Sequence, residues 1–526
     1  MNTTSVHIVH GPALQAEIPA ITLPEYVRRK ARELAGEVAL VDAASSRSYT
    51  YGQLDHLIGR FAAGLTRQGF RPGDTLLMFA PNLPEWVITA LGTMVAGGVV
   101  SGANPTYTVD ELAHQIRDSG ATFVFTIPSF LATVRDAALK AGIENIVLLG
   151  EAEGTLSFAA LVACTDPEPA PNIDPEGLAM LPYSSGTTGP SKGVRLSHRA
   201  MVTHTVQLLQ ASNPGIKTIL ALLPMFHASG FTVVTLLGLA LGAKLVTLPR
   251  FEPEGFLQAI TQHQVDFVAV VPPIMLFLAA HPMVSAHDLS CVKFIASGAA
   301  PLSEAIERKV VERLAVPVAQ AYGMTEACCI LSYSPVNTKA GSSGQLFPAT
   351  QARVVCTETG VDLPRGQTGE LWFRGPHFFS GYHQRPDSTA VTLVDGWLRT
   401  GDIGHVDEDG FVFITDRLKE LIKVKGFQVP PAELEALLLT HPQVADAAVI
   451  GRPDERSGEV PVAFVVPRGE LDAEGIKAWV AARVVEYKWL HDVLPCEAIP
   501  KNASGKILRR VLRDRQSQAM DPTQAT

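Results

Sequence analysis

Short apolar runs alternate with amphipathic segments along the first two thirds of the chain. Residues 38–42 (VALVD) and 74–80 (DTLLMFA) have the continuous apolar character of buried strands. Residues 51–69 repeat apolar positions at helical spacing and end at a glycine, which predicts an amphipathic helix. Similar apolar runs return at residues 122–127, 145–150, 266–272 and 292–298. Strands that alternate with helices predict an α/β fold with largely parallel sheets.

The pattern changes near residue 346 and again after Asp416. Short strands around Gly and Asp turns are expected at residues 351–360, 369–376 and 404–417. Beyond Asp416, a helix opened by prolines at residues 430–442 is followed by apolar strands and a second helical pattern, which predicts a small α/β unit. The last dozen residues are polar, and we expect them to be frayed.

The longest apolar stretch, residues 218–243, is long enough to raise the question of a membrane span. Pro224, His227 and glycines interrupt it, and Lys217 and Lys244 flank it. Such interruptions fit a folded core better than a lipid-exposed helix. We therefore expect a buried strand–turn–helix here and no integral membrane span.

The composition is that of a globular protein. The chain has 526 residues, of which 47% are hydrophobic and 18% are charged, so at least two domains are expected. A net charge of −9 argues against a nucleic-acid partner. The N-terminus lacks a basic start followed by an apolar block, and none of the six cysteines forms a C-x-x-C pair. We expect a cytoplasmic protein without a zinc site or disulfide framework, either a monomer or a homodimer.

Residues 181–194 (LPYSSGTTGPSKGV) combine hydroxyl side chains, glycines and one cation. Backbone amides in such loops bind phosphate oxygens, hydroxyls add donors, and a lysine adds charge. The stretch is not the common G-x-x-x-x-G-K-[ST] loop, because Ser191 precedes Lys192 and Gly193 follows it. The alternative to a phosphate-binding loop is a polar linker without a ligand.

Four further stretches have to be considered together with this loop. They are residues 296–301 (ASGAAP), 319–327 (AQAYGMTEA), 396–429 (GWLRTGDIGHVDEDGFVFITDRLKELIKVKGFQV) and 499–510 (IPKNASGKILRR). Alone, each could be a capped loop or a charged surface segment. Together with the loop, and in this order, they resemble the adenylate-forming enzymes, which include acyl-CoA synthetases, luciferases and peptide-synthetase adenylation domains. The resemblance runs from about residue 40 to residue 513.

The resemblance implies a large N-terminal domain, residues 1–418, made of α/β layers and a small β-barrel-like subdomain. It implies a mobile C-terminal α+β lid, residues 419–526, with Lys419 as the hinge. Lys506 then serves adenylation, and Lys423 lies on a thioester-forming face.

The resemblance also assigns ligands, with Glu326 holding Mg2+. The residues that it implies for ATP are Ser184, Ser185, Gly186, Thr187, Thr188, Gly189, Lys192, Ser297, Gly298, Ala299, Ala300, Gln320, Tyr322, Gly323, Thr325, Asp402, Arg417 and Lys506. Those implied for coenzyme A are Lys423, Lys425, Gly426 and Gln428. The catalytic set is Lys506, Lys423, Thr188, Glu326 and His227.

Residues 224–231 (PMFHASGF) resemble the wall of an acyl pocket. Domains that select amino acids usually place an aspartate where this chain has His227, so an amino acid is not expected as the substrate. The alternative is that His227 lies in the core and only forms a hydrogen bond with a backbone group. The expected pocket residues are His227, Ser229, Gly298, Gly323, Cys328 and Cys329.

The overall resemblance is greatest to 4-coumarate–CoA ligases and their bacterial relatives. Ala228 and Ser229 stand where those ligases commonly carry isoleucine and tyrosine, so the cavity could be wider or longer. Either an aryl-propenoic acid of the coumarate or cinnamate type or a medium-chain acid fits.

The resemblance implies an ATP-dependent acid–CoA ligase that uses ATP, Mg2+ and coenzyme A on a small carboxylic acid. The products would be an acyl-CoA, AMP and pyrophosphate, formed through an acyl-adenylate. An acyl-AMP ligase that loads a carrier protein is the near alternative, although the KVKGFQV segment favours free coenzyme A. A luciferase-like oxygenase shares the motifs. A nucleotide-binding regulator without turnover belongs to a different class, and Lys423, Lys506 and Glu326 argue against it.

Overall fold

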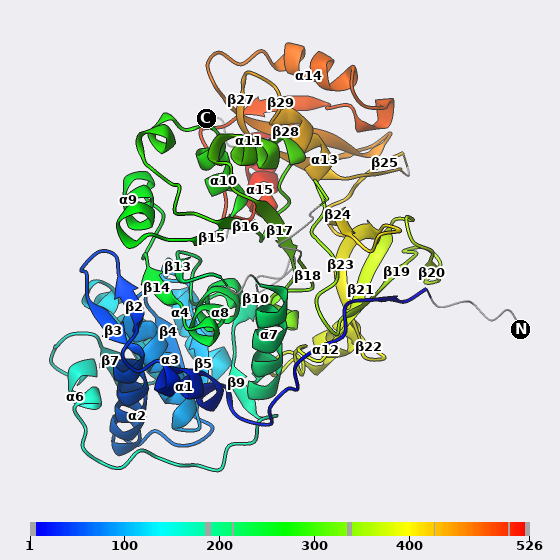
Figure 1. The fold of residues 1–526 in the computed structure, drawn as a ribbon. Coiled ribbons are helices and arrows are strands. Elements are labelled where there is room, and N and C mark those ends of the chain that lie inside the picture. The colour runs from blue at the N-terminus through cyan, green and yellow to red at the C-terminus, as the bar shows by residue number, and fades with distance from the viewer. Residues whose placement is uncertain are drawn as a thin grey trace, which may run out of the picture.

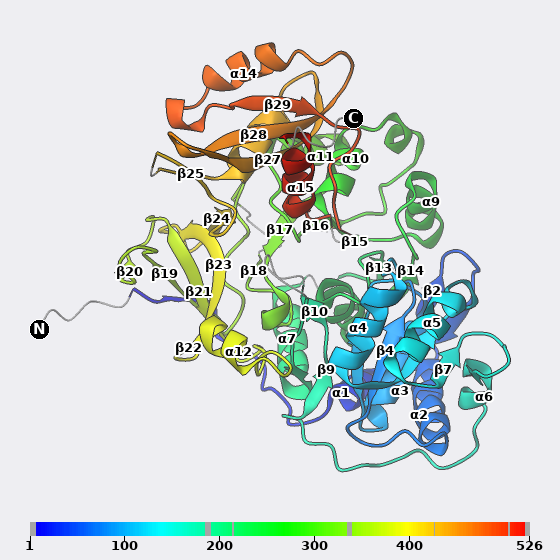
Figure 2. The same ribbon diagram turned by 180° about the vertical axis from the view of Figure 1, so that it is seen from behind.

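A computed structural model describes residues 7–184, 191–212, 215–333, 339–425, 427–502 and 505–520, with side chains up to residue 516. Two large sheets with helices, an antiparallel sheet beside them and a C-terminal lobe make up the molecule (Figure 1). We use "C-terminal lobe" for strands β25–β29 and helices α13–α15. The same arrangement is seen from behind in Figure 2, where α15 lies in front of the lobe.

The first sheet has helices on both faces. Its strands, in spatial order, are β12 (Leu196–Ser197), β9 (Leu178–Met180), β5 (Val99–Gly102), β4 (Thr75–Phe79), β6 (Ala121–Thr126), β7 (Asn145–Leu148) and β8 (Leu156–Ser157). All neighbours are parallel except β12 and β9. Leu76 and Met78 enter one hydrophobic core and Leu77 and Phe79 another, so both faces are buried. The helices are α2 (Tyr51–Arg67) and α3 (Pro84–Val95) on one side, and α4 (Val109–Ser119) and α5 (Leu131–Ala141) on the other.

The second sheet carries the strand ends that matter most for the site. Its order is β18 (Ser332–Tyr333), β17 (Val318–Tyr322), β16 (Phe294–Ser297), β15 (Phe267–Val270), β13 (Thr218–Ala221), β14 (Lys244–Thr247), β2 (Val38–Asp42) and β3 (Ser48–Thr50). The six strands from β17 to β2 are parallel, as the alternating pattern predicted. One face packs on α9 (Pro253–His263), α10 (Pro272–Ala280) and α11 (Glu304–Leu314), and the other faces α7 (His198–Ala211) and α8 (Leu236–Leu241). The α/β fold class is therefore confirmed.

The segment after residue 346 forms an antiparallel sheet, where a β-barrel-like subdomain was expected. Its main path is β1 (Val9–His10), β19 (Gln351–Val355), β21 (Gly369–Arg374), β23 (Trp397–Val406) and β22 (Leu393–Val394), with β20 (Asp362–Leu363) beside β19 and β24 (Val412–Arg417) beside β23. The strands β23 and β24 form a hairpin across residues 407–410 (DEDG), one of the expected Gly and Asp turns. Three further helices are α1 (Leu23–Glu33), α6 (Phe158–Val162) and α12 (Pro386–Thr392).

The C-terminal lobe has hydrophobic cores of its own. Its strands are β25 (Ile422–Val424), β26 (Phe427–Val429), β27 (Val444–Asp454), β28 (Gly458–Pro467) and β29 (Asp492–Pro495), and its helices are α13 (Pro431–Leu438), α14 (Ala473–Ala481) and α15 (Arg509–Met520). The last dozen residues were expected to be frayed, and for residues 515–520 this expectation is wrong, because they belong to helix α15. Leu512 packs in the core with Ile450 and Val462, and Arg509 pairs with buried Glu435 at 2.7 Å, so two contacts fix an otherwise polar helix.

The long apolar stretch is folded core, as predicted. It contains β13, a π-helix over Ser229–Thr235 and α8. In the part of the chain that the structure describes, no helix is both long and apolar enough to cross a membrane.

Candidate active site

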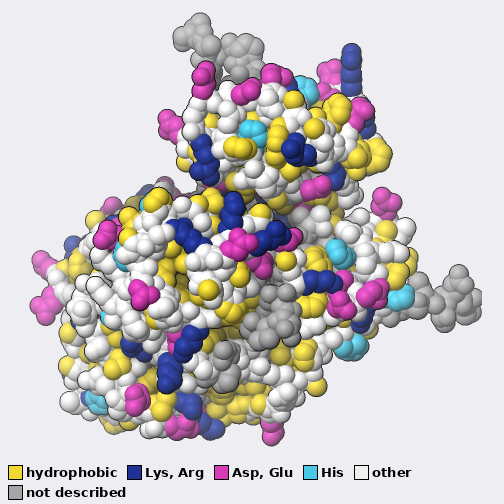
Figure 3. Space-filling view, turned by 45° about the horizontal axis from the view of Figure 1, so that its top comes forward, with side chains coloured by type: hydrophobic (Ala, Val, Ile, Leu, Met, Phe, Trp, Pro, Cys, Tyr) yellow, Lys and Arg dark blue, Asp and Glu magenta, His cyan; other side chains and the backbone are white. Residues whose placement is uncertain are grey.

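One cavity of about 400 Å³ lies where strands β15, β16 and β17 end and the C-terminal lobe meets the rest of the molecule. Ligand sites of parallel sheets commonly lie at this edge. Ser184, Lys192, Glu326, Arg417 and Lys506 all line the cavity, although they are far apart in the sequence. In Figure 3, Lys and Arg side chains gather along the junction between the smaller lobe and the larger one. The polar end of the cavity can therefore hold an anion.

Glu326 is the buried carboxylate at this polar end. It lies on a short turn of 3-10 helix, Thr325–Ala327, directly after β17. Its Oε1 atom accepts hydrogen bonds from the hydroxyls of Tyr382 at 2.6 Å and Ser184 at 3.3 Å. No described lysine or arginine forms an ion pair with it, so its charge is left to attract a cation.

Lys192, the lysine of the 181–194 stretch, lies near this carboxylate. Ser184 and Lys192 face each other in the antiparallel pair β10 (Tyr183–Ser184) and β11 (Lys192–Gly193). The Nζ atom of Lys192 lies 5.0 Å from the ring centre of Tyr382, a cation–π distance. The remaining loop residues of the prediction, Ser185, Gly186, Thr187, Thr188 and Gly189, and Gly426 of the lobe, lie outside the described residues.

Tyr382 is a site residue that sequence reasoning missed. Its hydroxyl binds Glu326, and its ring packs under Lys192. Burial, and then the charge of Glu326, raises the pKa of Tyr382, so the hydroxyl stays protonated and donates. A tyrosine in an ordinary glycine turn carries no sequence signal for such a role.

The turn at residues 296–301 and the segment after β17, both expected to bind ATP, border the cavity. Ser297, Gly298, Ala299, Gly323 and Thr325 line it. Ala300 follows in the turn, where Ala299 has the left-handed φ of 71°. Gln320 lies behind this turn and braces it: the amide accepts from the Leu302 N–H at 3.2 Å and donates to the Leu302 carbonyl at 3.1 Å and to Glu307 at 2.9 Å.

Asp402, Tyr322 and Arg417 form a cluster beside the turn. The Tyr322 hydroxyl donates to Asp402 Oδ2 at 2.6 Å, and Arg417 Nε lies 3.2 Å from Asp402 Oδ1. Burial raises the pKa of Tyr322. Arg417 lines the cavity, whereas Tyr322 and Asp402 lie just behind it, next to the lining residues Ala321 and Gly401. In this state the Asp402 carboxylate is engaged by protein groups.

The two predicted lysines of the C-terminal lobe lie in different environments. Lys506 lines the cavity together with Lys419 and Asn502. Burial, and then Arg417, lowers the pKa of Lys506 to about 8, against the opposing charge of Asp402. Lys423 is exposed on β25, outside the cavity lining, and its backbone N–H donates to Glu459 at 2.7 Å. Lys425 and Gln428 are also exposed.

His227 and Ser229 lie on the wall of the cavity's apolar half. The backbone N–H of Ser229 donates to His227 Nδ1 at 3.3 Å, and the Ser229 hydroxyl lies 3.0 Å from the same atom. An N–H can only donate, so Nδ1 is the acceptor and Nε2 carries the proton. Burial, and then Lys506, lowers the pKa of His227 to about 4, which keeps the ring neutral.

The two cysteines expected in the pocket are placed differently. Cys329 lines the cavity, whereas Cys328 is absent from the lining and is buried in the core. Both have positive φ, and the Cys328 carbonyl accepts a hydrogen bond from Thr232. The backbone therefore turns sharply here, so that adjacent side chains face different surroundings.

A metal would have to be held by few protein ligands. Among the described residues, no group of three or more His, Cys, Asp or Glu side chains could hold an ion. One free carboxylate beside an anion site fits Mg2+, which keeps several waters and commonly binds one or two carboxylates plus substrate phosphates.

Two protein-family models match this chain. The AMP-binding enzyme family matches residues 27–383, and the AMP-binding enzyme C-terminal domain matches residues 433–506. A 4-coumarate–CoA ligase 5 from Oryza sativa subsp. japonica is 41% identical, over 95% of this chain and 96% of its own.

Two solved structures share the fold over nearly the whole chain. ATP-bound MatB from Rhodopseudomonas palustris is 28% identical, with a TM-score of 0.86 over 95% of this chain and 100% of that one. The anthranilate CoA ligase AuaEII in complex with anthranoyl-AMP is 26% identical, with a TM-score of 0.88 over 95% of this chain and 98% of that one.

Proposed function

Because the chain belongs to the AMP-binding enzyme family, we propose that it is an ATP-dependent acid–CoA ligase that activates a hydrophobic carboxylic acid. The substrate carboxylate attacks the α-phosphorus of ATP, and the bond to pyrophosphate breaks. The thiolate of coenzyme A then attacks the acyl carbonyl of the adenylate, and AMP leaves with the bonding electrons. The observation that carries the proposal is that Lys506 reaches the cavity that Lys192 and Glu326 also line.

The first step needs charge neutralisation more than covalent catalysis, because the substrate carboxylate is itself the nucleophile. Lys192 and Lys506, which are far apart in the sequence, both supply positive charge to the cavity. Arg417 lies with them on the lining. Bound at Glu326, Mg2+ would offset phosphate charge. The unmatched carboxylate of Glu326, held by two hydroxyls, fits that ion.

The apolar half of the cavity is the acid site in this proposal. Neutral His227, at the wall position where amino-acid-selecting domains usually place an aspartate, favours an uncharged tail over an α-amino acid. Apolar lining residues suit an aryl-propenoic acid or a medium-chain acid. The likeness to 4-coumarate–CoA ligases supports the aryl acid.

A rotation of the lid, residues 419–526, belongs to the same proposal. The described state has Lys506 in the cavity and Lys423 outside it, which suits adenylation. For Lys423, Lys425 and Gln428 to meet coenzyme A near the adenylate, the lobe must turn about Lys419. A few hinge residues can absorb such a change.

The proposal is tested in two stages. ATP–pyrophosphate exchange is measured across cinnamates, benzoates and C4–C12 fatty acids; coenzyme A is then added and the thioester is detected by mass spectrometry. We expect exchange that depends on the acid, followed by an acyl-CoA. No exchange with any acid would contradict the enzyme assignment, and exchange without a thioester would favour loading of a carrier protein.

A further inference from the structure

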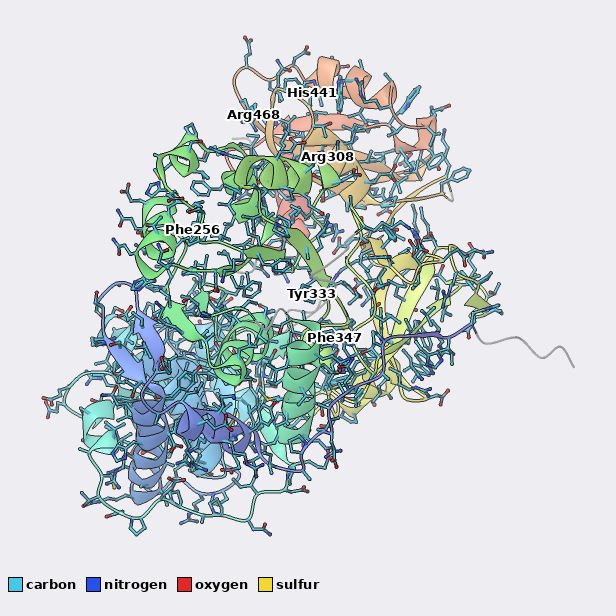
Figure 4. The ribbon with its side chains drawn as sticks, in the orientation of Figure 1. Phe256, Arg308, Tyr333, Phe347, His441 and Arg468 are labelled. Atoms are coloured by element: carbon cyan, nitrogen blue, oxygen red, sulfur yellow. The ribbon has the colours of Figure 1, made fainter. Side chains whose placement is uncertain are left out.

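The apolar half of the cavity contains two polar side chains that none of the roles above uses, and one of them, Ser212, donates its hydroxyl to the Leu209 carbonyl at 3.3 Å. Leu208, Ile216, Val233, Leu237 and Phe267 line this half and offer only hydrocarbon. Tyr333 lines it as well. Figure 4 labels Tyr333 near the centre of the molecule, between the end of β17 and helix α7.

The ring of Tyr333 is held in place from two sides. Strand β18 pairs antiparallel with β17, which sets Tyr333 opposite Ala321, and the Tyr333 N–H donates to the Gln345 carbonyl at 2.9 Å. Its ring meets Phe294 edge to face, with 6.4 Å between ring centres and an angle of 86°. A ring fixed in this way presents its hydroxyl at a defined place.

The position of Phe294 tells which end of the cavity Tyr333 serves. Phe294 is the first residue of β16, whereas Gly298 follows the other end of that strand at the nucleotide turn. At ~3.3 Å per residue, the two lie roughly 13 Å apart. Phe267, the first residue of β15, lines the cavity at the same end as Phe294. The Tyr333 ring therefore lies toward the tail of a bound acid, away from its carboxylate.

The hydroxyl of Tyr333 has no hydrogen-bond partner among the described residues, and burial raises its pKa, so it stays protonated. Among the described residues, five other tyrosine hydroxyls donate to a protein acceptor. They are those of Tyr49 with Glu85, Tyr51 with Ala243, Tyr183 with Asp118, Tyr322 with Asp402 and Tyr382 with Glu326. A hydroxyl cut off from water without a hydrogen-bond partner is unfavourable. Because Tyr333 lines the cavity, a group bound there can supply the partner that the described residues do not.

We infer that Tyr333 is a specificity-determining residue of the acid pocket, selecting acids that carry a hydrogen-bonding oxygen in the tail. This inference rests on the proposed function. An acid with a tail hydroxyl satisfies the Tyr333 hydroxyl, whereas an unsubstituted tail displaces water from it and leaves it unpaired. Sites built to bind a substrate hydroxyl reject the analogue that lacks it for this reason.

The test compares matched pairs of acids in the wild-type enzyme and Tyr333→Phe. The pairs are cinnamate with 4-hydroxycinnamate, and octanoate with 8-hydroxyoctanoate, and kcat/KM for adenylation is measured by pyrophosphate release. For at least one pair, we expect the wild-type enzyme to prefer the hydroxylated acid about tenfold, which corresponds to one hydrogen bond of about 1.4 kcal/mol. Tyr333→Phe should lose that preference while keeping or improving activity with the unsubstituted acid.

Two controls keep the outcome clear. Tyr49→Phe removes the hydroxyl of a half-buried tyrosine that binds Glu85 outside the cavity, and should keep the wild-type preference. Tyr333→Leu provides a second variant should Tyr333→Phe fail to fold. The same preference in wild-type enzyme and Tyr333→Phe, or no preference for either hydroxylated acid, would overturn the inference. Activity with none of the four acids or with the wider panel would instead count against the proposed function.

Discussion

Tyr382 joins Glu326 and Lys192, two residues expected to serve the same phosphate chemistry. Its hydroxyl donates to the Glu326 carboxylate at 2.6 Å, and its ring lies 5.0 Å from the Lys192 ammonium. One side chain thus sets the spacing between a carboxylate and a cation on the cavity wall. Both partners lie within the matched AMP-binding region, as does Tyr382 itself.

Tyr382→Phe should weaken adenylation about tenfold, because it removes a hydrogen bond to a charged group, worth roughly 1.5–3 kcal/mol, but keeps the ring. The Mg2+ concentration needed for half-maximal pyrophosphate exchange should rise, since Glu326 loses its orienting donor. Binding of Mn2+ in the presence of ATP, followed by electron paramagnetic resonance, should weaken in parallel. An unchanged metal dependence would show that Tyr382 has only a packing role.

Lys506→Ala and Lys423→Ala should separate the two half-reactions. Loss of Lys506 should lower adenylation about a hundred- to thousandfold, the usual effect of removing one charged donor from a transition state. Lys423→Ala should keep pyrophosphate exchange and slow thioester formation from supplied acyl-adenylate. Equal impairment of exchange in both variants would contradict the division of labour and the rotation about Lys419.

The pH dependence of adenylation should report the Lys506 ammonium. Burial lowers its pKa to about 8, so the charged form is present below that pH and is lost as the pH rises through 8. We expect kcat/KM for ATP in the free enzyme to fall on the alkaline side near pH 8. In Lys506→Arg this decline should disappear, because a guanidinium does not deprotonate in that range. A decline that persists unchanged would assign it to another group.

Gly323→Ala should destabilise the protein and disturb the acid pocket. A methyl group at Gly323 would overlap the carbonyl oxygen of Cys329, so the cavity wall would have to move. Overpacking of this kind lowers the free energy of unfolding by about 1–3 kcal/mol or more. Chemical denaturation measures the change, with Gly36→Ala as the control because its added methyl meets no atom within 4 Å. Equal stability of the two variants would show that the wall yields easily.

Much of the fold follows from short windows of sequence. Apolar runs such as residues 74–80 and 266–272 became β4 and β15, and the interrupted apolar stretch became β13, a π-helix and α8. The end of the chain was misjudged, because α15 depends on Leu512 in a core and on Arg509 beside Glu435. The composition of this segment cannot reveal such contacts, since the residues that Leu512 and Arg509 meet come from strands and a helix far away in the sequence.

The sequence alone determined which chemical groups are available and which family pattern they follow, since strand and helix periodicity and motif order are local properties of the chain. The tertiary structure decided which groups meet. It brought Tyr382 to Glu326 across 56 residues and Tyr322 to Asp402 across 80, and it placed Lys506 inside the cavity and Lys423 outside it. The reason is physical: side chains become neighbours through the order of strands in a sheet and the seating of one lobe on another, and neither is written in any short stretch of residues.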